Sequence, residues 1–425
     1  MELDLSEVGA ARWDRNDPLA VFRERFCVPP ETIYLDGNSL GLLAREAETS
    51  LRRVMDEWRA LAVDGWTEAG PPWFGLAERL AEEMAPLVGA EPGEVAVTGS
   101  TTGNLHQLLA TLYRPAGARR KILIDALAFP SDVYAVESHL RLRGLDPAEA
   151  LVKVPSRDGL TLDEGEILDH LTSEVQTAVL PSVLFTSGQL LDLPRLAAAA
   201  RERGVLLGLD CSHSAGVVPH RLHEWGVDFA FWCGYKYLNG GPGAAAALFL
   251  HRRYHGRAPG LAGWWGSDKS RQFDMASTFT PAADAGALQI GTPHLLSLAP
   301  LEGALRITRE AGLERIREKS LRLTAYLIAL ADAHLSELGF RLATPREEAR
   351  RGGHVALRHP EAARICKALK AARIVPDFRP PNLVRLAPVP LYNSFQECRA
   401  AVLALERIVR ERRYEAFPAG RGLVA

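Results

Sequence analysis

Seven short runs of apolar residues constrain the fold more than any other feature of this sequence. They are Val95–Thr98, Lys121–Asp125, Leu151–Val154, Thr177–Phe185, Val205–Leu209, Phe229–Trp232 and Ala244–Leu250. The runs are continuously apolar rather than alternating, which is typical of strands covered on both faces of a mostly parallel sheet. Stretches with helical periodicity, such as Leu193–Gly204, lie between them. The sequence therefore predicts an α/β domain.

The pattern changes after Pro300. The segments that follow are predicted as amphipathic helices at Leu301–Glu310 and Leu313–Leu338, short strands near His354–Arg358 and Leu383–Leu386, and a final helix at Ser394–Arg412. Long helices followed by short strands are typical of an α+β arrangement. We therefore predict a second, smaller α+β domain, with a boundary near residue 300.

Composition excludes several classes of protein. The 425 residues are 47% hydrophobic, so the chain can bury a sizeable core. Its 50 basic and 52 acidic side chains nearly cancel, which gives no indication of binding to nucleic acid or to a membrane. No run approaches 18 apolar residues, and the acidic start lacks the features of a signal peptide. Five cysteines without a CxxC pair indicate free thiols, so we expect a soluble, cytoplasmic protein.

A carboxylate and a lysine follow two of the predicted strands. Asp210 comes directly after Val205–Leu209, and Lys236 follows Phe229–Trp232 and precedes a glycine-rich segment. Because the carboxyl ends of parallel strands meet at one edge of a sheet, both side chains can reach one ligand there. Pyridoxal 5′-phosphate (PLP) needs such a pair, since a lysine bonds to its aldehyde and a carboxylate keeps its ring nitrogen protonated. The alternative is a helix cap at Asp210 and a solvated lysine at 236.

Two further segments suit the same cofactor. The stretch VAVTGSTTGNL predicts a strand, a turn and a helix start, where backbone N–H groups and the hydroxyls of Thr101 and Thr102 can bind a phosphate. An ordinary capped helix uses similar residues. Farther on, Phe129 can lie flat against a cofactor ring and Asp132 can add charge near its nitrogen. The alternatives are a core aromatic for Phe129 and a helix-start carboxylate for Asp132.

Metal binding is not expected. His213, His220 and His223 lie near Cys211, but no second ligand pair with a recognised spacing accompanies them. His213 is three residues beyond Asp210, which places it better for contact with the cofactor.

The chain resembles the kynureninase family of fold-type-I, aminotransferase class V-like PLP enzymes over nearly its whole length. The motifs that carry this resemblance are YLDGNSLG (Tyr34–Gly41), FPSD (Phe129–Asp132), DCSHSAG (Asp210–Gly216), FWCGYKYLNGGPG (Phe231–Gly243), GWWG (Gly263–Gly266) and RLAPVPLYNSF (Arg385–Phe395). The resemblance implies hydrolytic cleavage of the Cβ–Cγ bond of L-kynurenine to anthranilate and L-alanine, and of 3-hydroxykynurenine to 3-hydroxyanthranilate. The pathway would be tryptophan degradation or NAD biosynthesis.

The resemblance also implies an architecture. A large PLP domain with a mostly parallel, seven-stranded sheet would span residues 46–299. A small domain would span residues 300–425 and be completed by residues 1–45. The protein would be a homodimer with active sites between its subunits.

Site residues follow from the resemblance as expectations. The catalytic residues would be Lys236, which carries the cofactor, Tyr235, a proton donor, and Asp210, which pairs with the ring nitrogen. The cofactor would also contact Thr101, Thr102, Phe129, Pro130, Ser131, Asp132 and His213 and, from the other subunit, Trp264 and Thr292. The substrate would contact Arg385, Trp66 and Asn38, with Arg385 on its α-carboxylate. From the residues alone, Arg385 is a solvated strand arginine and Trp66 a core tryptophan.

Two positions bear on substrate preference. Family members that favour 3-hydroxykynurenine resemble this chain but carry His and Asn in place of Trp66 and Thr292, so we expect a preference for L-kynurenine.

Two alternative functions stay open. A cysteine desulfurase or selenocysteine lyase needs a reactive cysteine over its site, whereas Cys366 and Cys398 lie in helical patterns. A non-catalytic PLP-binding regulator would usually lack the lysine or carry a DNA-binding appendage.

Overall fold

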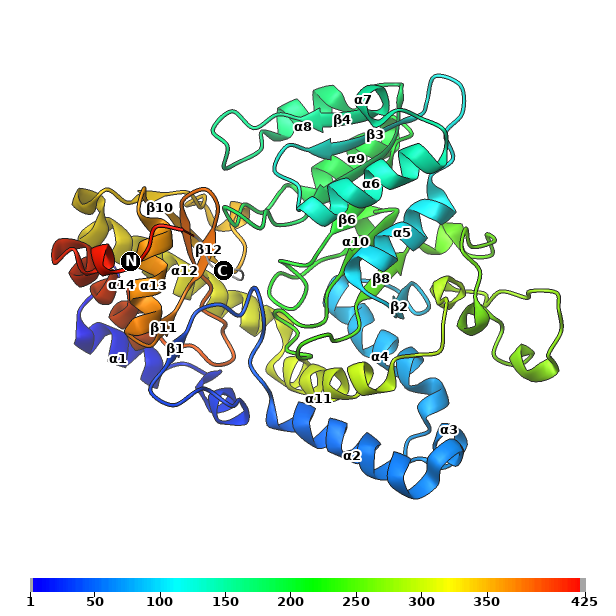
Figure 1. The fold of residues 1–425 in the computed structure, drawn as a ribbon, viewed down its shortest axis with the longest axis horizontal. Coiled ribbons are helices and arrows are strands. Elements are labelled where there is room, and N and C mark those ends of the chain that lie inside the picture. The colour runs from blue at the N-terminus through cyan, green and yellow to red at the C-terminus, as the bar shows by residue number, and fades with distance from the viewer. Residues whose placement is uncertain (1–2, 421–425) are drawn as a thin grey trace.

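A computed structural model describes residues 3–420 and has a seven-stranded sheet at its centre (Figure 1). The strand order is β2-β8-β7-β6-β5-β3-β4, and β8 runs antiparallel to both of its neighbours while the other pairs are parallel. The strands are β2 (Val95–Val97), β3 (Lys121–Asp125), β4 (Leu151–Val154), β5 (Val175–Pro181), β6 (Leu206–Asp210), β7 (Phe229–Trp232) and β8 (Ala247–Leu250). The predicted mostly parallel sheet is thus confirmed.

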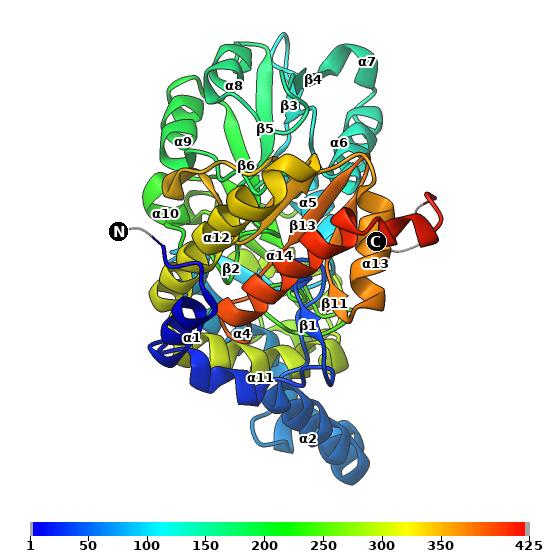
Figure 2. The same cartoon turned by 90° about the vertical axis from the view of Figure 1, so that its left-hand side faces the viewer.

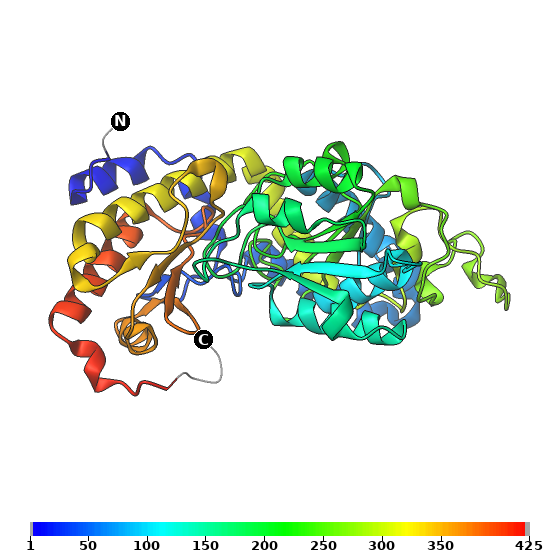
Figure 3. The same cartoon turned by 90° about the horizontal axis from the view of Figure 1, so that it is seen from above.

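Helices cover both faces of this sheet, as the continuously apolar strands predict (Figure 3). Helices α5 (Thr101–Leu112) and α6 (Pro130–Leu142) pack on one face, and α4 (Leu76–Met84) and α9 (Leu193–Glu202) pack on the other. Successive residues of a strand point to opposite faces. Accordingly, Phe229 and Phe231 of β7 belong to one core cluster, and Ala230 and Trp232 belong to the other.

Several predicted elements differ from the observed ones by a few residues at their ends, and two differ most. The run predicted at Thr177–Phe185 corresponds to β5, which begins earlier, at Val175, and ends at Pro181, and the amide of Ser182 still donates to the carbonyl of Asp210 in β6 before the chain leaves the sheet. The helix predicted at Leu301–Glu310 begins earlier, as α11 (Leu295–Ala311), and contains Pro300. Packing of α11 along α2 (Arg45–Leu61) favours the helix despite this proline, since tertiary contacts outweigh local preference.

The C-terminal part forms a smaller layer of helices on an antiparallel sheet (Figure 2). Its strand order is β12-β13-β10-β9, and its helices are the long α12 and two shorter ones. The elements are α12 (Leu313–Leu335), β9 (Arg341–Leu342), β10 (Val355–Arg358), α13 (Ala362–Ala371), β12 (Asp377–Arg379), β13 (Leu383–Leu386) and α14 (Phe395–Arg410). The predicted α+β arrangement after residue 300 agrees with this sheet and these helices.

The start of the chain joins this C-terminal layer. Strand β1 (Ile33–Tyr34) pairs in parallel with β11 (Ile374–Val375). Asp17 forms a buried ion pair of 2.6 Å with Lys319 of α12. The division at residues 46 and 300 itself stays a prediction, since α11 runs through residue 300 without a break.

The segment from residue 252 to residue 294 consists of turns and short 3-10 helices, and its middle part projects from the body of the molecule as an arm, while Tyr254, Ala285 and Leu288 near its ends are buried in the core (Figure 1, yellow-green). Trp264, Phe273 and Met275 on this arm are exposed. Within residues 3–420, no helix is both long and apolar enough to span a membrane.

Candidate active site

A cavity of about 690 Å³ lies at the carboxyl edge of the central sheet. It is lined by Ser39, Gly99, Ser100, Thr101, Thr102, Gly103, Phe129, Ser131, Asp132, Phe185, Asp210, Ser212, His213, Tyr235, Lys236, Gly243, Ala244, His294 and Arg379. Most of these residues follow the ends of β2, β3, β5, β6 and β7, which point the same way. Ligands of open α/β sheets bind at this edge. The structure therefore brings Asp210 and Lys236 to one site, as the sequence predicts.

Lys236 lies beside a neutral histidine. Its Nζ is 3.0 Å from Nε2 of His213. Burial, with the positive charges of Lys236 and Arg385, holds the pKa of His213 well below its ordinary value. The imidazole therefore stays uncharged near neutral pH and accepts a hydrogen bond from the lysine. Phe129 forms another wall, with its ring centroid 6.0 Å from Nζ.

The loop that carries Lys236 is held by the N-terminal segment. The amide of Gly41 donates to the carbonyl of Tyr235 at 2.7 Å. A Cβ at position 41 would lie 2.5 Å from the carbonyl oxygen of Lys236, so the two backbones approach more closely than a larger residue permits. This contact gives the YLDGNSLG motif a structural role at the site.

Three carboxyl groups lie close together at the cavity: Asp132 and Asp210 line it, and Asp125 lies near both. Asp210 ends β6, and its Oδ1 accepts from the amide of Ser212 at 2.8 Å. Burial and the negative charge of Asp210 raise the pKa of Asp132 well above its ordinary value. Burial also raises the pKa of Asp125 to about 6, with a further contribution from Asp210. These carboxylates repel one another, so a cation bound among them would be stabilised.

The first turn of α5 faces the same cavity. Ser100 caps this helix, and its Oγ accepts from the amide of Gly103 at 3.2 Å. Thr101 and Thr102 occupy the next two positions, where backbone N–H groups have no acceptor within the helix. These amides, the two hydroxyls and the helix dipole together suit an anion such as a phosphate.

The cavity contains nine of the fifteen residues expected at the site. These are Thr101, Thr102, Phe129, Ser131, Asp132, Asp210, His213, Tyr235 and Lys236. Two others lie just behind its wall: Pro130 opens α6, and Asn38 is fully buried next to Ser39. Arg385, on β13, is also fully buried, so it is not the solvated strand arginine of the alternative reading.

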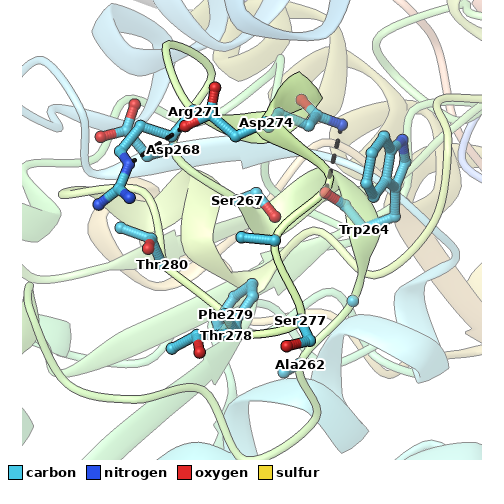
Figure 4. A pocket seen from close by; sticks show the side chains of 13 residues that line it. Ala262, Trp264, Ser267, Asp268, Arg271, Asp274, Ser277, Thr278, Phe279 and Thr280 are labelled. Carbon is cyan, nitrogen blue, oxygen red and sulfur yellow. Dashed lines mark hydrogen bonds and ion pairs between the residues drawn. The ribbon is translucent and has the colours of Figure 1, made fainter.

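The remaining expected residues lie elsewhere in the chain. Thr292 lines a neighbouring cavity of about 250 Å³ that shares Gly99 and Gly103 with the first. Trp66 packs at 6.0 Å from Trp73, in an aromatic cluster outside the cavity. Trp264 lies on the projecting arm, at the wall of a third cavity of about 240 Å³ (Figure 4).

Several cavity residues were not predicted from the sequence. They are Ser39, Phe185, Ser212, His294 and Arg379. Ser212 and Phe185 lie in the loops that follow strands β6 and β5, so their position soon after a strand end is a signal that could have found them. The other three reach the cavity through contacts between distant segments, which no local pattern indicates.

The histidines near residue 220 make internal hydrogen bonds. His220 contacts the hydroxyl of Ser214 at 2.7 Å. His223 and His251 place nitrogen atoms close to the buried carboxylate of Glu94. That carboxylate already accepts from the amide of Arg252 at 2.8 Å and lies 2.9 Å from Nδ1 of His223. The cluster is therefore explained as a structural network.

Comparisons with known proteins identify the family. A family model described as Kynureninase C-terminal domain matches residues 316–405. A kynureninase of Geobacillus thermodenitrificans (strain NG80-2) is 54% identical over 416 residues, which cover 98% of this chain and 97% of that relative. A kynureninase of Shouchella clausii (strain KSM-K16) is 53% identical over the same shares of the two chains. The chain belongs to the kynureninase family. The resemblance that the motifs carry is thus confirmed.

Solved structures share the fold of this kynureninase-family chain. A cysteine desulfurase from Thermococcus onnurineus NA1 has a TM-score of 0.78 and 19% identity, and the match covers 92% of this chain and 98% of that one. The cystine C–S lyase C-DES has a TM-score of 0.77 and 18% identity, with 89% and 98% of the two chains covered. At such identities the likeness concerns the fold alone. It confirms the predicted fold-type-I class.

Proposed function

We propose that the chain is a PLP-dependent hydrolase that cleaves the Cβ–Cγ bond of L-kynurenine, giving anthranilate and L-alanine in tryptophan degradation. The observation that carries the proposal is the convergence of Lys236, Asp132 and Asp210 on one cavity in a member of the kynureninase family. C-DES, which has the same fold, has been solved with glycine covalently linked to its PLP cofactor.

The residues of the cavity fit PLP. The protonated ring nitrogen is the cation that the repelling carboxyl groups of Asp132 and Asp210 need. Lys236 would hold the aldehyde carbon, and the first turn of α5, which lines the same cavity, would hold the phosphate. Phe129 offers a flat apolar surface to the ring. When bound, PLP supplies an electron-accepting ring that stabilises negative charge on the substrate carbons next to its amine.

Proton transfer falls to Lys236 and its neighbours. Nζ of Lys236, when free, would be the base that takes the proton from the substrate α-carbon. The neutral His213 lies 3.0 Å from Nζ and can orient that amine. Burial, together with Cys233, raises the pKa of Tyr235 to about 12, so its hydroxyl keeps its proton and can donate it to the alanine product.

Positive charge for the substrate α-carboxylate comes from the C-terminal sheet. Arg385 of β13 donates to the carboxylate of Asp377 and to the carbonyl of Phe185, so its guanidinium is fixed behind the cavity wall. Arg379 of β12 lies next to it and lines the cavity. The amino-acid end of the substrate is therefore oriented toward this sheet.

A homodimer is part of the proposal. The arm exposes Trp264, Phe273 and Met275, and α2 exposes Met55 and Trp58. Large exposed apolar side chains are typical of an interaction surface. The arm of one subunit would bring Trp264 and Thr292 to the cavity of the other. Sedimentation of the purified protein tests this, and a monomer at micromolar concentration would contradict it.

The expected preference for L-kynurenine depends on this dimer. Trp66 lies 5.5 Å from Trp265, away from the cavity of its own chain, so it can meet the substrate across the subunit interface. An indole there offers apolar surface to an unsubstituted ring and no partner for a ring hydroxyl.

A cysteine desulfurase would need a reactive cysteine at the cavity, and among residues 3–420 no cysteine lines it. Cys211, Cys233, Cys366 and Cys398 are buried, and Cys27 does not line the cavity. Burial raises the thiol pKa of Cys366 and Cys398, which leaves them protonated and unreactive. All five cysteines are free, which supports a reducing location such as the cytoplasm.

The deciding experiment mixes PLP-loaded protein with L-kynurenine or 3-hydroxykynurenine and follows the aromatic amine product. Wild-type protein should release anthranilate, Lys236→Ala should release none, and L-kynurenine should be the better substrate. Normal cofactor absorbance without product from either substrate would reject the hydrolase and favour a PLP-binding regulator.

A further inference from the structure

The contact between His213 and Lys236 requires one particular tautomer of the histidine. Nε2 of His213 lies 3.0 Å from Nζ of Lys236 and accepts a hydrogen bond from it. The imidazole is neutral, because burial and the charges of Lys236 and Arg385 hold its pKa well below the ordinary value. A neutral imidazole carries one N–H group, so the proton must be on Nδ1. His213 therefore presents an N–H donor on the side away from the lysine.

This donor makes no hydrogen bond within residues 3–420, although its nitrogen is buried. Because the atom is closed to solvent, a ligand in the cavity cannot reach it without a rearrangement. A buried donor without an acceptor is unfavourable. The rings of Phe185 and His354 contact His213, with centroids 6.4 Å and 5.9 Å away. Of these two neighbours, only the imidazole of His354 has a nitrogen lone pair that can accept the hydrogen.

His354 is itself a buried histidine with unused hydrogen-bonding capacity. It is fully buried, and neither of its ring nitrogens makes a hydrogen bond in the part of the chain that the structure describes. Burial and the charge of Arg385 hold its pKa well below the ordinary value, so the ring has one N–H group and one lone pair. The backbone of Thr186 opposes this shift, which is the effect of a carbonyl beside a ring N–H group. The lone pair of the other nitrogen is thus left for a donor such as Nδ1 of His213.

The turn at Gly188 holds the imidazole of His354 in place. A Cβ at position 188 would lie 2.8 Å from the carbonyl oxygen of His354 and 3.2 Å from its Nε2, so the backbone of this turn packs directly on the histidine. The carbonyl of Gly188 also accepts from the amide of Gly352 at 2.7 Å. His354 directly precedes β10, so the loop after β5 and the C-terminal sheet together fix the ring beside His213.

We propose that His354 is a positioning residue that accepts the hydrogen on Nδ1 of His213 and so keeps the lone pair of Nε2 directed at Lys236. The consequence for Lys236 rests on the proposed function. When Nζ takes a proton from the substrate it becomes an ammonium group, and the lone pair of Nε2 accepts one of its hydrogens. In the other tautomer an N–H group would face the ammonium group and repel it. His354 therefore favours the proton transfer without touching the substrate.

The first test reads the tautomer of His213 in the cofactor-free protein, by heteronuclear NMR of isotope-labelled histidines. Loss of a signal in His213→Gln assigns the resonances. Wild-type protein should carry the proton on Nδ1. His354→Leu removes the acceptor and should lower the ratio of the Nδ1–H to the Nε2–H tautomer roughly threefold to tenfold. His354→Gln should keep the wild-type ratio, because its amide oxygen can accept the same hydrogen.

The matched control is the histidine at the other end of β10. His359 is also buried, but its ring nitrogens contact the carbonyl of Leu338 at 3.1 Å and the amide of Glu361 at 3.0 Å. His359→Leu should therefore leave the tautomer ratio of His213 unchanged.

The second test measures the consequence for Lys236 in the PLP-loaded protein. Exchange of the α-hydrogen of L-alanine for deuterium requires the proton transfer but no cleavage of a carbon–carbon bond. His354→Leu should lower the maximal exchange rate roughly threefold to tenfold, in proportion to the lost tautomer, and should change the half-saturating concentration of L-alanine less than about twofold. His354→Gln should restore the rate.

Three results would overturn the inference: a wild-type His213 with its proton on Nε2, an unchanged ratio in His354→Leu, or an equal loss in His354→Leu and His354→Gln. An unchanged exchange rate would refute the role toward Lys236. An unchanged melting temperature shows that a variant is folded. If His354→Leu does not fold, a scalar coupling between the two rings of the wild type decides the question, and its absence counts against the hydrogen bond. The expected tautomer response in a protein that leaves L-kynurenine intact would refute the proposed function and keep this inference.

Discussion

Replacing Asp125 by asparagine should stabilise the cofactor-free protein at neutral pH. This carboxyl group is buried at the end of β3, where its Oδ1 accepts from the amide of Leu127 at 2.8 Å. Burial, with a contribution from Asp210, raises its pKa from 3.8 to about 6, so keeping it ionised in the folded protein costs about 3 kcal/mol. Asparagine keeps the acceptor for Leu127 and has no charge to bury.

The pH dependence gives this prediction its test. Between about pH 4 and pH 6 the folded protein binds more protons at position 125 than the unfolded chain does, so the free energy of unfolding falls as the pH rises and stays lower above that range. The gain from Asp125→Asn should be about 3 kcal/mol near pH 8 and roughly half of that near pH 5. Urea unfolding of the cofactor-free protein, followed by tryptophan fluorescence, measures both values.

A matched surface substitution serves as the control. Asp169 is exposed near the end of α8 (Glu164–His170), so Asp169→Asn should change the free energy of unfolding by less than about 0.5 kcal/mol at either pH. An equal gain from Asp125→Asn at both pH values, or a loss near pH 8, would refute the argument from a raised pKa.

Three further outcomes follow from particular contacts. Lys319→Ala leaves the buried carboxylate of Asp17 without its cation, so urea unfolding should show a loss of about 3 to 5 kcal/mol, and a loss below about 1 kcal/mol would contradict this. Gly303→Ala places a Cβ 2.1 Å from the carbonyl oxygen of Glu46, so calorimetry should show a lower melting temperature, equivalent to about 1 to 3 kcal/mol. Asp36 has a pKa of about 7, so it gains negative charge beside Arg379 and Arg385 as the pH rises through that value. Because L-alanine carries a carboxylate and L-alaninamide does not, binding of L-alanine should weaken relative to binding of L-alaninamide. Asp36→Asn should abolish this change, and a variant that keeps it would show another group to be responsible.

The central sheet could be predicted from the sequence because its strands are buried on both faces. Phe229–Trp232, for example, has the same bounds as a predicted run and as β7. The helix α11 was harder to predict, since Pro300 indicates a boundary locally while packing against α2 continues the helix through it. Propensity is a weak guide where tertiary contacts decide.

The residues of the candidate site also differ in whether the sequence could predict them. Asp210 and Lys236 could be predicted because each follows a strand and strand ends share one edge of the sheet. Arg379 could not, because its access to the cavity depends on how the C-terminal sheet docks against the segment around Ser39. The family motif indicated Arg385 but not its full burial behind the wall.

The pairing of β1 with β11 has a consequence for how the protein is made. Ile33 pairs with Ile374, so the beginning of the chain cannot complete its native contacts until almost the whole chain has left the ribosome. At ordinary rates of synthesis this interval is roughly 15 to 70 s. During that time the strand Ile33–Tyr34 has no partner, although Gly41, a few residues later, can already contact the Lys236 loop. Chains that are released early would therefore lack the pairing that anchors the N-terminal segment next to this contact, even where the central sheet is complete.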